Sequence, residues 1–507
     1  MFRKKWMPAL LIIAATLPVS AQRIVYSEAG KDDTRSMSFE IAGKVGGNFL
    51  IYKNNRGKSW ITVLDNDMKD IGRSDLDFVP NNDRMINVDF FPYNDLCYMI
   101  YQYQKKNIVY CMAAKLDASG NKVGDVIDMD TTQLGFAANN KIYTVLTNED
   151  KSRISVFKIN SKNRRLYVIS TSLFDDKLVL LKKSRLTLPM EDRNEYLGDF
   201  QLDNEGDLVF SKFYRNSNDN ITSASLMIKN AMADSIMTRE LNIEKTWLDE
   251  LHIKIDNYNK RYFLTSFYYK ERRGNIDGYF FYVWDKISGN TILQDTTTFS
   301  DELRREARGD AGVRSAFNDY FIRNIVLRRD GGFVLGSESY YTTSRFNNWN
   351  RWDYLYGSPF YSNSYNDYYY TNNYRLFGSS SRFSNQAVRY HADNITVMSF
   401  DSKGNQEWNN VMGKSQFDDQ SDDMLSYQMM NTGGQLHFLF NFQERRNNLL
   451  TDFSIGTDGQ LNRNPTLKNL DKGYDFMPKY AKQVGARQMI IPCGYRNYLC
   501  FAKLEYN

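Results

Sequence analysis

The chain has 507 residues and a mass of 59.3 kDa, more than one ordinary core of ~100–200 residues requires. Its 42% hydrophobic and 25% charged residues exclude a disordered chain, a collagen and a polytopic membrane protein. Aromatic residues reach 15% while prolines number only 9, which favours β-strands. Without Arg3, Lys4 and Lys5, 62 basic residues face 60 acidic ones, a net charge of +2. We therefore expect no nucleic-acid partner.

The N-terminus has the pattern of a secretory signal peptide, predicted over residues 1–21. The basic residues above precede a short apolar stretch, Met7 to Leu17, and Val19-Ser20-Ala21 fits the small-residue cleavage pattern. The apolar stretch is shorter than the roughly 20 residues that a membrane anchor needs. We expect export through the inner membrane to the periplasm, the outer cell surface or the medium, with no transmembrane segment in the mature chain.

A unit of two apolar strands joined by a polar turn recurs along the mature chain, and it often ends in a turn with Asp and Gly. The first unit holds Asn48 to Lys53 and Trp60 to Asp65, and the second holds Leu96 to Tyr103 and Ile108 to Leu116. Each of the six later units also contains an apolar strand. These strands are Ile142 to Leu146, Leu208 to Phe210, Tyr279 to Trp284, Phe333 to Leu335, Leu436 to Asn441 and Tyr498 to Leu504.

Such units, about sixty residues apart, are typical of a β-propeller. A single small sheet cannot bury both its faces, and stacking sheets radially does so. We therefore predict an all-β fold over residues 22–507: one propeller of eight blades, with seven as the alternative count. Ile24-Val25-Tyr26 would join the C-terminal strands and close the ring. Two β-sandwiches in tandem are a weaker alternative, because no Pro/Gly/Ser-rich linker lies near the middle.

The longest irregular segment covers residues 344–386, within the sixth predicted blade, and is rich in Tyr, Asn and Ser. Loops of this length inside compact domains are usually functional or disordered. Exposed rings anchor partners well and stack on sugar faces, so the aromatic residues of this segment are the ligand-binding candidates. These candidates are Trp349, Trp352, Tyr354, Tyr356, Tyr368, Tyr369 and Tyr370.

Three stretches resemble those of uncharacterised secreted β-propeller-like proteins of Bacteroidota-type bacteria. They are Gly46 to Asn55, Asp330 to Tyr340, and Asp401 to Trp408 followed by Lys414-Ser415-Gln416. The likeness spans most of the mature chain, but its motifs are structural turns. It implies a propeller in an envelope or exported location, and it implies no activity.

The Asp and Gly turns are interpreted as structural. Asp starts such a turn by binding its own backbone, and Gly takes the positive φ that the turn requires. Each turn offers only one or two oxygens to calcium, and Asp65 with Asp67 and Asp70 is the densest group. Asp401, Gly404 and Trp408 resemble a repeat of quinone-cofactor propellers, which scaffold propellers also use without a cofactor. We therefore predict no metal and no cofactor.

The four cysteines form two close pairs in the sequence. An exported protein reaches an oxidising compartment, in which such pairs can form disulfides. If Arg496-Asn497 make a two-residue turn, Cys493 and Cys500 are directly opposed. Cys97 and Cys111 likewise bracket a polar turn. Each pair is either a cross-strand disulfide or two buried thiols.

Catalytic motifs are sparse, and no catalytic residue is assigned. His252, His391 and His437 are the only imidazoles; His252 and His437 alternate with apolar residues, as strand side chains do. Paired carboxylates such as Asp418-Asp419, Asp422-Asp423 and Glu191-Asp192 are candidates for glycosidase chemistry. The leading hypothesis is a non-enzymatic scaffold of the cell envelope that binds an envelope or extracellular protein. The alternatives are a glycan-binding module that uses the aromatic insertion, and a propeller-type glycoside hydrolase.

Overall fold

The structure is a computed structural model. The residues it describes are 22–30, 37–80, 84–138, 141–163, 165–192, 194–215, 220–309, 312–344, 351, 355, 388–419, 421–444, 447–465, 467, 473–495 and 498–506. Within them, strands dominate and the one α-helix is α1 (Asp301–Ala307), with short 3-10 turns at η2 (Val313–Ser315) and η3 (Pro478–Tyr480). Ser300 caps α1 by accepting a hydrogen bond from the backbone N–H of Leu303 at 3.2 Å. In this part of the chain, no helix is both long and apolar enough to cross a membrane.

Five sheets are four-stranded antiparallel meanders, in which each strand pairs with the next one along the chain. The first is β2 (Met37–Val45), β3 (Asn48–Asn55), β4 (Lys58–Leu64) and β5 (Asp70–Asp75). The second is β6 (Arg84–Pro92), β7 (Cys97–Lys105), β8 (Ile108–Leu116) and β9 (Lys122–Gln133). The third is β10 (Thr144–Thr147), β11 (Arg153–Asn163), β12 (Leu166–Asp175) and β13 (Leu180–Pro189). The other two are β23 (Tyr320–Leu327), β24 (Phe333–Ser344), β25 (Val388–Phe400) and β26 (Gln406–Asp418), and then β27 (Tyr427–Asn431), β28 (Gln435–Glu444), β29 (Asn447–Gly456) and β30 (Leu461–Arg463).

Two larger sheets complete the fold. In the nine-stranded sheet, two further meanders are bridged by β18 (Trp247–Leu248), which pairs with β16 and β20. They are β14 (Glu195–Leu202), β15 (Leu208–Arg215), β16 (Ile221–Lys229) and β17 (Ile236–Glu240), and β19 (His252–Asp256), β20 (Arg261–Tyr269), β21 (Gly278–Asp285) and β22 (Asn290–Thr298). The five-stranded sheet joins the C-terminal strands to the first strand of the chain: β31 (Asp475–Phe476), β32 (Lys482–Gly485), β33 (Gln488–Tyr495), β34 (Tyr498–Glu505) and β1 (Arg23–Tyr26).

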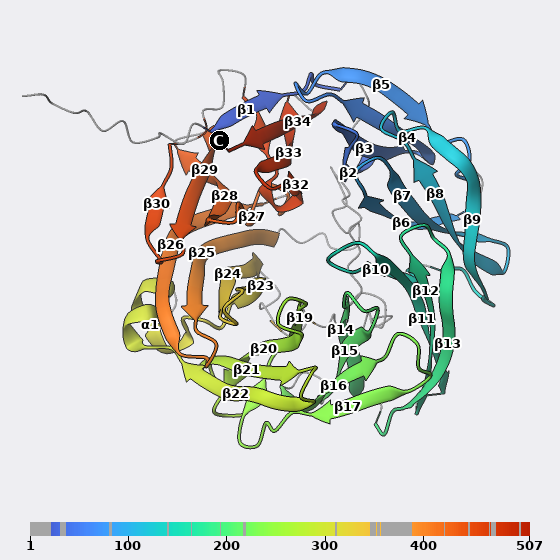
Figure 1. The fold of residues 1–507 in the computed structure, drawn as a ribbon. Helices are drawn as coiled ribbons and strands as arrows, with labels where there is room; N and C mark the ends of the chain where they lie inside the picture. Colours follow the sequence, from blue (N-terminus) through green and yellow to red (C-terminus); the bar gives the residue numbers. More distant parts are fainter. Residues whose placement is uncertain are drawn as a thin grey trace, which may run out of the picture.

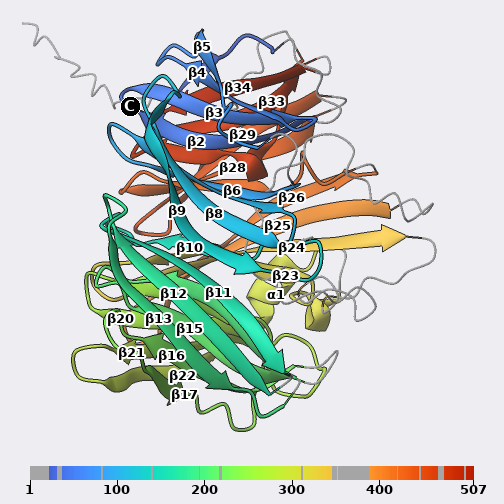
Figure 2. The ribbon, with the colours of Figure 1, turned by 90° about the vertical axis from the view of Figure 1, so that its right-hand side faces the viewer.

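The meanders stand around a common axis, with β2, β6, β10, β14, β19, β23, β27 and β32 nearest the centre (Figure 1). The side view shows neighbouring sheets stacked one on the next (Figure 2). The chain therefore has an all-β, propeller-like fold, which confirms the fold class predicted from the sequence. The predicted insertion falls between β24 and β25, and apart from Ser344, Arg351 and Leu355 it lies outside the described residues.

The core is made of apolar clusters between neighbouring sheets. Between the first two sheets, for example, Leu50 and Ile61 pack with Phe90 and Met99. Another cluster joins the first sheet to the last, where the rings of Phe39 and Phe501 lie 5.6 Å apart between centroids. Each sheet buries apolar side chains on both of its faces. Polar faces are therefore confined mainly to the innermost and outermost strands of the sheets.

The Asp turns follow the predicted mechanism. The Asp401 carboxylate accepts the backbone N–H groups of Lys403 and Asn405, both at 2.8 Å, and Gly404 has a φ of +82°. Gly459, in the turn after β29, has a φ of +80°, and a Cβ there would lie 2.5 Å from Cγ of Trp408. The Trp408 ring thus rests on a turn of the next sheet, where its indole N–H donates to the carbonyl of Thr457 at 3.3 Å. The turns dock one sheet on the next.

Candidate functional site

A cavity of about 420 Å³ lies between the innermost strands β14, β19 and β23. We call it the axial pocket. Phe321, Ile322, Ile325 and Leu355 contribute apolar lining. Its polar lining consists of Asp199, Gln201, Glu250, His252, Lys254 and Arg323. The strands of a propeller that lie closest to its axis turn one side toward the central channel, so polar side chains on that side reach a ligand without disturbing the core.

Strand alternation places two of these groups on one side of β19. His252 and Lys254 flank Ile253, whose side chain is buried. Successive side chains of a strand point to opposite faces, so His252 and Lys254 share one face, and Glu250, two residues before the strand, lines the same pocket. His252 Nε2 lies 3.2 Å from Glu250 Oε2.

Asp199 and Arg323 reach the pocket through irregular backbone. The register between β14 and β15 shifts between Gly198 and Gln201, and Asp199 within this bulge has a φ of 48°. The register between β23 and β24 shifts around Arg323. A β-bulge re-aims a side chain and is frequent beside active sites. One Asp199 carboxylate oxygen accepts the backbone N–H of Ile253, which ties β14 to β19 across the pocket.

A buried ion pair supports the pocket from behind. The Arg351 guanidinium binds the Asp249 carboxylate through two nitrogens, and Asp249 has no exposed surface. Arg351 also stacks on the Phe321 ring, 4.0 Å from its centroid, and Tyr269 donates its hydroxyl to Asp249 at 3.0 Å. Since Asp249 precedes Glu250, this network fixes the start of the segment that carries Glu250 and His252.

The surroundings of the two carboxyl groups of the pocket shift their pKa values in opposite directions. Burial raises the pKa of Asp199, and the charge of His252 and the hydrogen bond from Ile253 only partly offset it. Burial also acts on Glu250, but the charge of His252, followed by that of Arg351, outweighs it and lowers the Glu250 pKa. For His252, burial disfavours the imidazolium, yet Glu250 and Asp199 together raise its pKa to about 8. The Asp199 carboxyl therefore holds its proton more readily than an ordinary aspartic acid, and the Glu250 carboxyl releases its proton more readily than an ordinary glutamic acid.

A second cavity, of about 1050 Å³, lies between the β23–β24 turn and the sheet of β27–β30. Arg328, Asp330, Glu407 and Trp408 are among its lining residues. Here Arg328 binds both Asp330 and Glu407, and Ser399 also donates to Glu407 at 2.8 Å. Arg328, Asp330 and Glu407 therefore bind one another.

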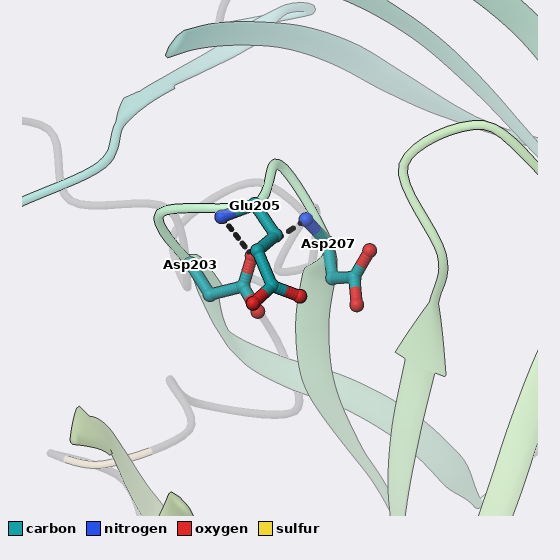
Figure 3. Close-up of side chains that lie close together, drawn as sticks. All are labelled: Asp203, Glu205 and Asp207. Carbon is teal, nitrogen blue, oxygen red and sulfur yellow. Dashed lines mark hydrogen bonds between the residues drawn. The ribbon is translucent and has the colours of Figure 1, made fainter. Parts of the chain in front are cut away.

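Three carboxylates also converge at the β14–β15 turn, which we call the acidic turn: Asp203, Glu205 and Asp207 (Figure 3). Asp203 accepts the backbone N–H groups of Glu205 and Asp207 at 2.9 and 2.8 Å (Figure 3). The Lys286 ammonium lies 2.6, 2.5 and 2.8 Å from carboxylate oxygens of the three acids. Lysine thus occupies the position in which a cation would bind, and the group is a structural ion cluster.

The residues predicted from the sequence are placed as follows. The signal peptide and all seven aromatic candidates, Trp349, Trp352, Tyr354, Tyr356, Tyr368, Tyr369 and Tyr370, lie outside the described residues. Cys493 and Cys500 are opposed in register, and their sulfur atoms lie 2.8 Å apart. The register does not bring the other pair together: Cys97 opposes Leu116, Cys111 opposes Gln102, and the two thiols lie in different core clusters.

The three imidazoles are separated. His391 stacks on Tyr341 at 4.5 Å between ring centroids, and His437 lies 3.2 Å from Asp452 in another sheet. The sequence interpretation correctly made His252 a strand side chain, but it missed that this strand faces the axis. Alternation of Glu250, His252 and Lys254 between apolar residues was the available signal. Asp199 had no such signal, because a bulge carries it into the pocket.

No protein-family model matches the chain, and a search of curated proteins gives no match either. Several solved structures resemble it at low identity. The dihydro-heme d1 dehydrogenase NirN is 11% identical, with a TM-score of 0.35, over 94% of this chain and 71% of that one. Prolyl oligopeptidase B from Galerina marginata is 8% identical, with a TM-score of 0.40, and this chain covers 56% of it. Apocarotenoid oxygenase from Synechocystis is 9% identical, with a TM-score of 0.32, over 96% and 94% of the two chains.

These comparisons correct one prediction. The leading sequence hypothesis was a non-enzymatic scaffold, whereas the three solved structures named above are enzymes. Their low identities and TM-scores transfer no particular activity to this chain. What this chain can do must be argued from its own axial pocket.

Proposed function

We propose that the protein is a hydrolytic enzyme that uses acid–base catalysis in the axial pocket. The observation that carries the proposal is the convergence of two carboxyl groups and an imidazole, Asp199, Glu250 and His252, in one cavity. They come from two separate inner strands and the segment between them. The directions of their pKa shifts support different roles for the two carboxyl groups.

In the proposed step, Asp199 donates its proton to the leaving-group oxygen while the bond to that oxygen breaks. Ionised Glu250 accepts a proton from the attacking water, whose oxygen forms the new bond. Asp199 ends ionised and Glu250 protonated, and exchange with solvent restores both. The imidazolium of His252 holds Glu250 ionised before the step. A proton donor paired with an ionised carboxylate is the machinery of glycoside hydrolysis, so a glycoside is the substrate class that we propose.

The test is the hydrolysis of a panel of chromogenic glycosides by the purified chain from residue 22. Asp199→Asn and Glu250→Gln should each lower kcat by about 10²–10⁴-fold, the usual contribution of a general acid or base. Asp419→Asn is the matched control, because Asp419 is an exposed carboxylate paired with Arg389 and does not line the pocket. Full activity of both pocket variants, with their circular dichroism unchanged, would refute the assignment.

We further propose that the meanders form eight blades and that β1 closes the ring against β34. The register of Ile24 with Leu504 and of Tyr26 with Ala502 supports this, as does the apolar cluster between the first and last sheets. Deleting residues 22–26 should lower the midpoint of thermal unfolding. An unchanged midpoint would contradict closure by this strand.

We also propose that the chain is exported after cleavage behind Ala21. The side-chain amide of Gln22, the resulting first residue, donates a hydrogen bond to the buried Asp452 carboxylate, a contact compatible with that start. Mass spectrometry of the protein from an expressing bacterium, fractionated into cytoplasm, envelope and medium, should find Gln22 as the first residue outside the cytoplasm. Recovery of the intact chain from Met1 in the cytoplasm would contradict export.

A further inference from the structure

The axial pocket contains more positive than negative groups, and this excess extends the proposed function to the charge of the substrate. Lys254 and Arg323 line the pocket together with His252, whose pKa lies at about 8. Facing these three groups are Glu250 and Asp199, and the pKa of Asp199 is raised. Among the lining side chains, three basic groups therefore stand against two carboxyl groups.

Lys254 is the clearest sign that this charge serves a ligand. Its side chain is exposed at the pocket, and it makes no hydrogen bond or ion pair with any described residue. Two other lysines illustrate a structural role instead: Lys286 contacts three carboxylates, and Lys414 is buried against Glu338 at 2.8 Å. An ammonium held at a cavity wall by a regular strand is placed for an anion from outside.

Arg323 shares one carboxylate partner with a second cation. Its Nε lies 3.5 Å from Glu338 Oε2, but Glu338 also binds the Lys414 ammonium and accepts the hydroxyl of Ser426. One buried carboxylate therefore faces two cations. Stacking over the rings of Phe321 and Tyr340, at 5.6 and 5.7 Å from their centroids, orients the guanidinium.

His252 adds a directed donor at the same wall. Its Nε2 is buried and makes no well-directed hydrogen bond with the described residues, although Glu250 Oε2 lies 3.2 Å away. A buried polar nitrogen without a directed partner is costly unless a ligand or water completes it. The pocket thus combines an exposed ammonium, a guanidinium and an incompletely bonded imidazole.

We propose that the substrate carries a negatively charged group, a carboxylate, sulfate or phosphate ester, which Lys254 and Arg323 bind beside the reacting bond. This inference rests on the proposed hydrolytic function for its location and on the charge balance for its chemistry. Charge-assisted hydrogen bonds from Lys and Arg are the usual means of recognising such groups. In this arrangement the neighbouring carboxyl groups of Asp199 and Glu250 do not bind the anion and carry out the acid–base steps.

The experiment is a calorimetric titration of the purified chain with four sugars: D-glucuronate, glucose 6-sulfate, glucose 6-phosphate and uncharged D-glucose. At least one acidic sugar should bind about tenfold or more tightly than glucose, and the best of the three identifies the anion. Lys254→Gln and Arg323→Gln should each weaken that binding by roughly tenfold, whereas Lys254→Arg should retain most of it. Lys260→Gln is the control, because Lys260 pairs with Glu205 at the acidic turn. Equal binding of glucose and the acidic sugars, or full binding by both Gln variants, would overturn the inference.

The titration is repeated on Glu250→Gln to separate this inference from the proposed function. If the pocket prefers acidic sugars but neither carboxyl variant affects hydrolysis, the anion site stands and the catalytic assignment fails. If neutral glycosides are hydrolysed as well as acidic ones and Lys254→Gln changes neither rate, the catalytic assignment stands and the anion site fails.

Discussion

The acidic turn and the axial pocket are both built from carboxylates around a basic group, yet they are balanced differently. At the acidic turn, Lys286 contacts all three acids. Tyr262 donates at 2.8 Å to the Asp203 oxygen that Lys286 contacts, and the backbone N–H of Ala231 donates at 2.7 Å to the other oxygen of Asp207. In the axial pocket, an ammonium has no described partner, and two carboxyl groups have pKa values shifted in opposite directions. Completed polar networks stabilise a fold, whereas incomplete ones beside a cavity indicate function.

The strongest test of this contrast is Lys286→Met, which removes the cation from the acidic turn. Asp203 and Asp207 are buried, so their carboxylates would be left close together without compensation. We expect a loss of about 3–5 kcal/mol in the free energy of unfolding, measured by chemical denaturation. Lys260→Met, which removes only an exposed partner of Glu205, should cost less than ~1 kcal/mol. Similar small losses for both would show that the turn is not a structural ion cluster.

Gly459→Ala tests whether the turns dock neighbouring sheets. The new Cβ would meet the Trp408 ring at 2.5 Å, at a φ of +80° that L-residues rarely adopt. Gly433→Ala has a similar φ of +89° but meets nothing within 4 Å, so it isolates the cost of backbone strain. We expect Gly459→Ala to lower the free energy of unfolding by about 1–3 kcal/mol more than Gly433→Ala. Equal effects would mean that Trp408 moves aside without cost.

The pocket, unlike the acidic turn, should show a pH dependence near neutrality. Because the folded pKa of His252, about 8, lies above its ordinary value near 6.5, protonation stabilises the folded chain. This contribution, on the order of 1–2 kcal/mol, is complete below pH ~6.5 and is lost as the pH rises through about 8. Denaturation at pH 6 and pH 9 should reveal it in the wild type and not in His252→Gln. In Glu250→Gln, NMR titration should find the His252 pKa lowered, because Glu250 is its main stabilising partner.

The smallest change in stability is expected for Lys254→Gln in the axial pocket. Lys254→Gln removes a cation from the pocket just as Lys286→Met removes one from the acidic turn. Lys254 has no described partner. The free energy of unfolding of the Lys254→Gln variant should therefore stay within ~0.5 kcal/mol of the wild-type value. A loss comparable with that of Lys286→Met would show that Lys254 supports the fold, and would remove its role as a ligand group.

Much of the fold could be predicted because local patterns repeat. Alternating apolar strands and Asp and Gly turns each have a local cause, and the turn at Asp401 with Trp408 forms as its sequence indicates. The opposition of Cys493 to Cys500 followed from counting residues about one short turn. The same counting failed for Cys97 and Cys111, because they are not symmetric about the turn that joins β7 to β8.

The candidate site was harder to predict because it depends on which strands face the axis. Glu250, His252 and Lys254 show ordinary strand alternation, and nothing local distinguishes an inner strand from an outer one. Asp199 and Arg323 enter through bulges, which break the alternation that sequence reasoning relies on. Arg351 lies about a hundred residues from Asp249, so their contact is visible only in three dimensions.

The pairing of the first strand with the last constrains the order of folding during biosynthesis. Tyr26 pairs with Ala502, and Gln22 and Tyr506, the second-to-last residue, both donate to the Asp452 carboxylate. A ribosome delivers these partners at opposite ends of translation, so β1 must wait, unpaired, until the final strand emerges. The sheets between the two ends of the chain can form earlier. The pairing of β1 with β34 joins residues far apart in the sequence and is therefore expected to be slow. A chain truncated by even its final strand would therefore leave an open sheet edge at each end, a surface that invites aggregation.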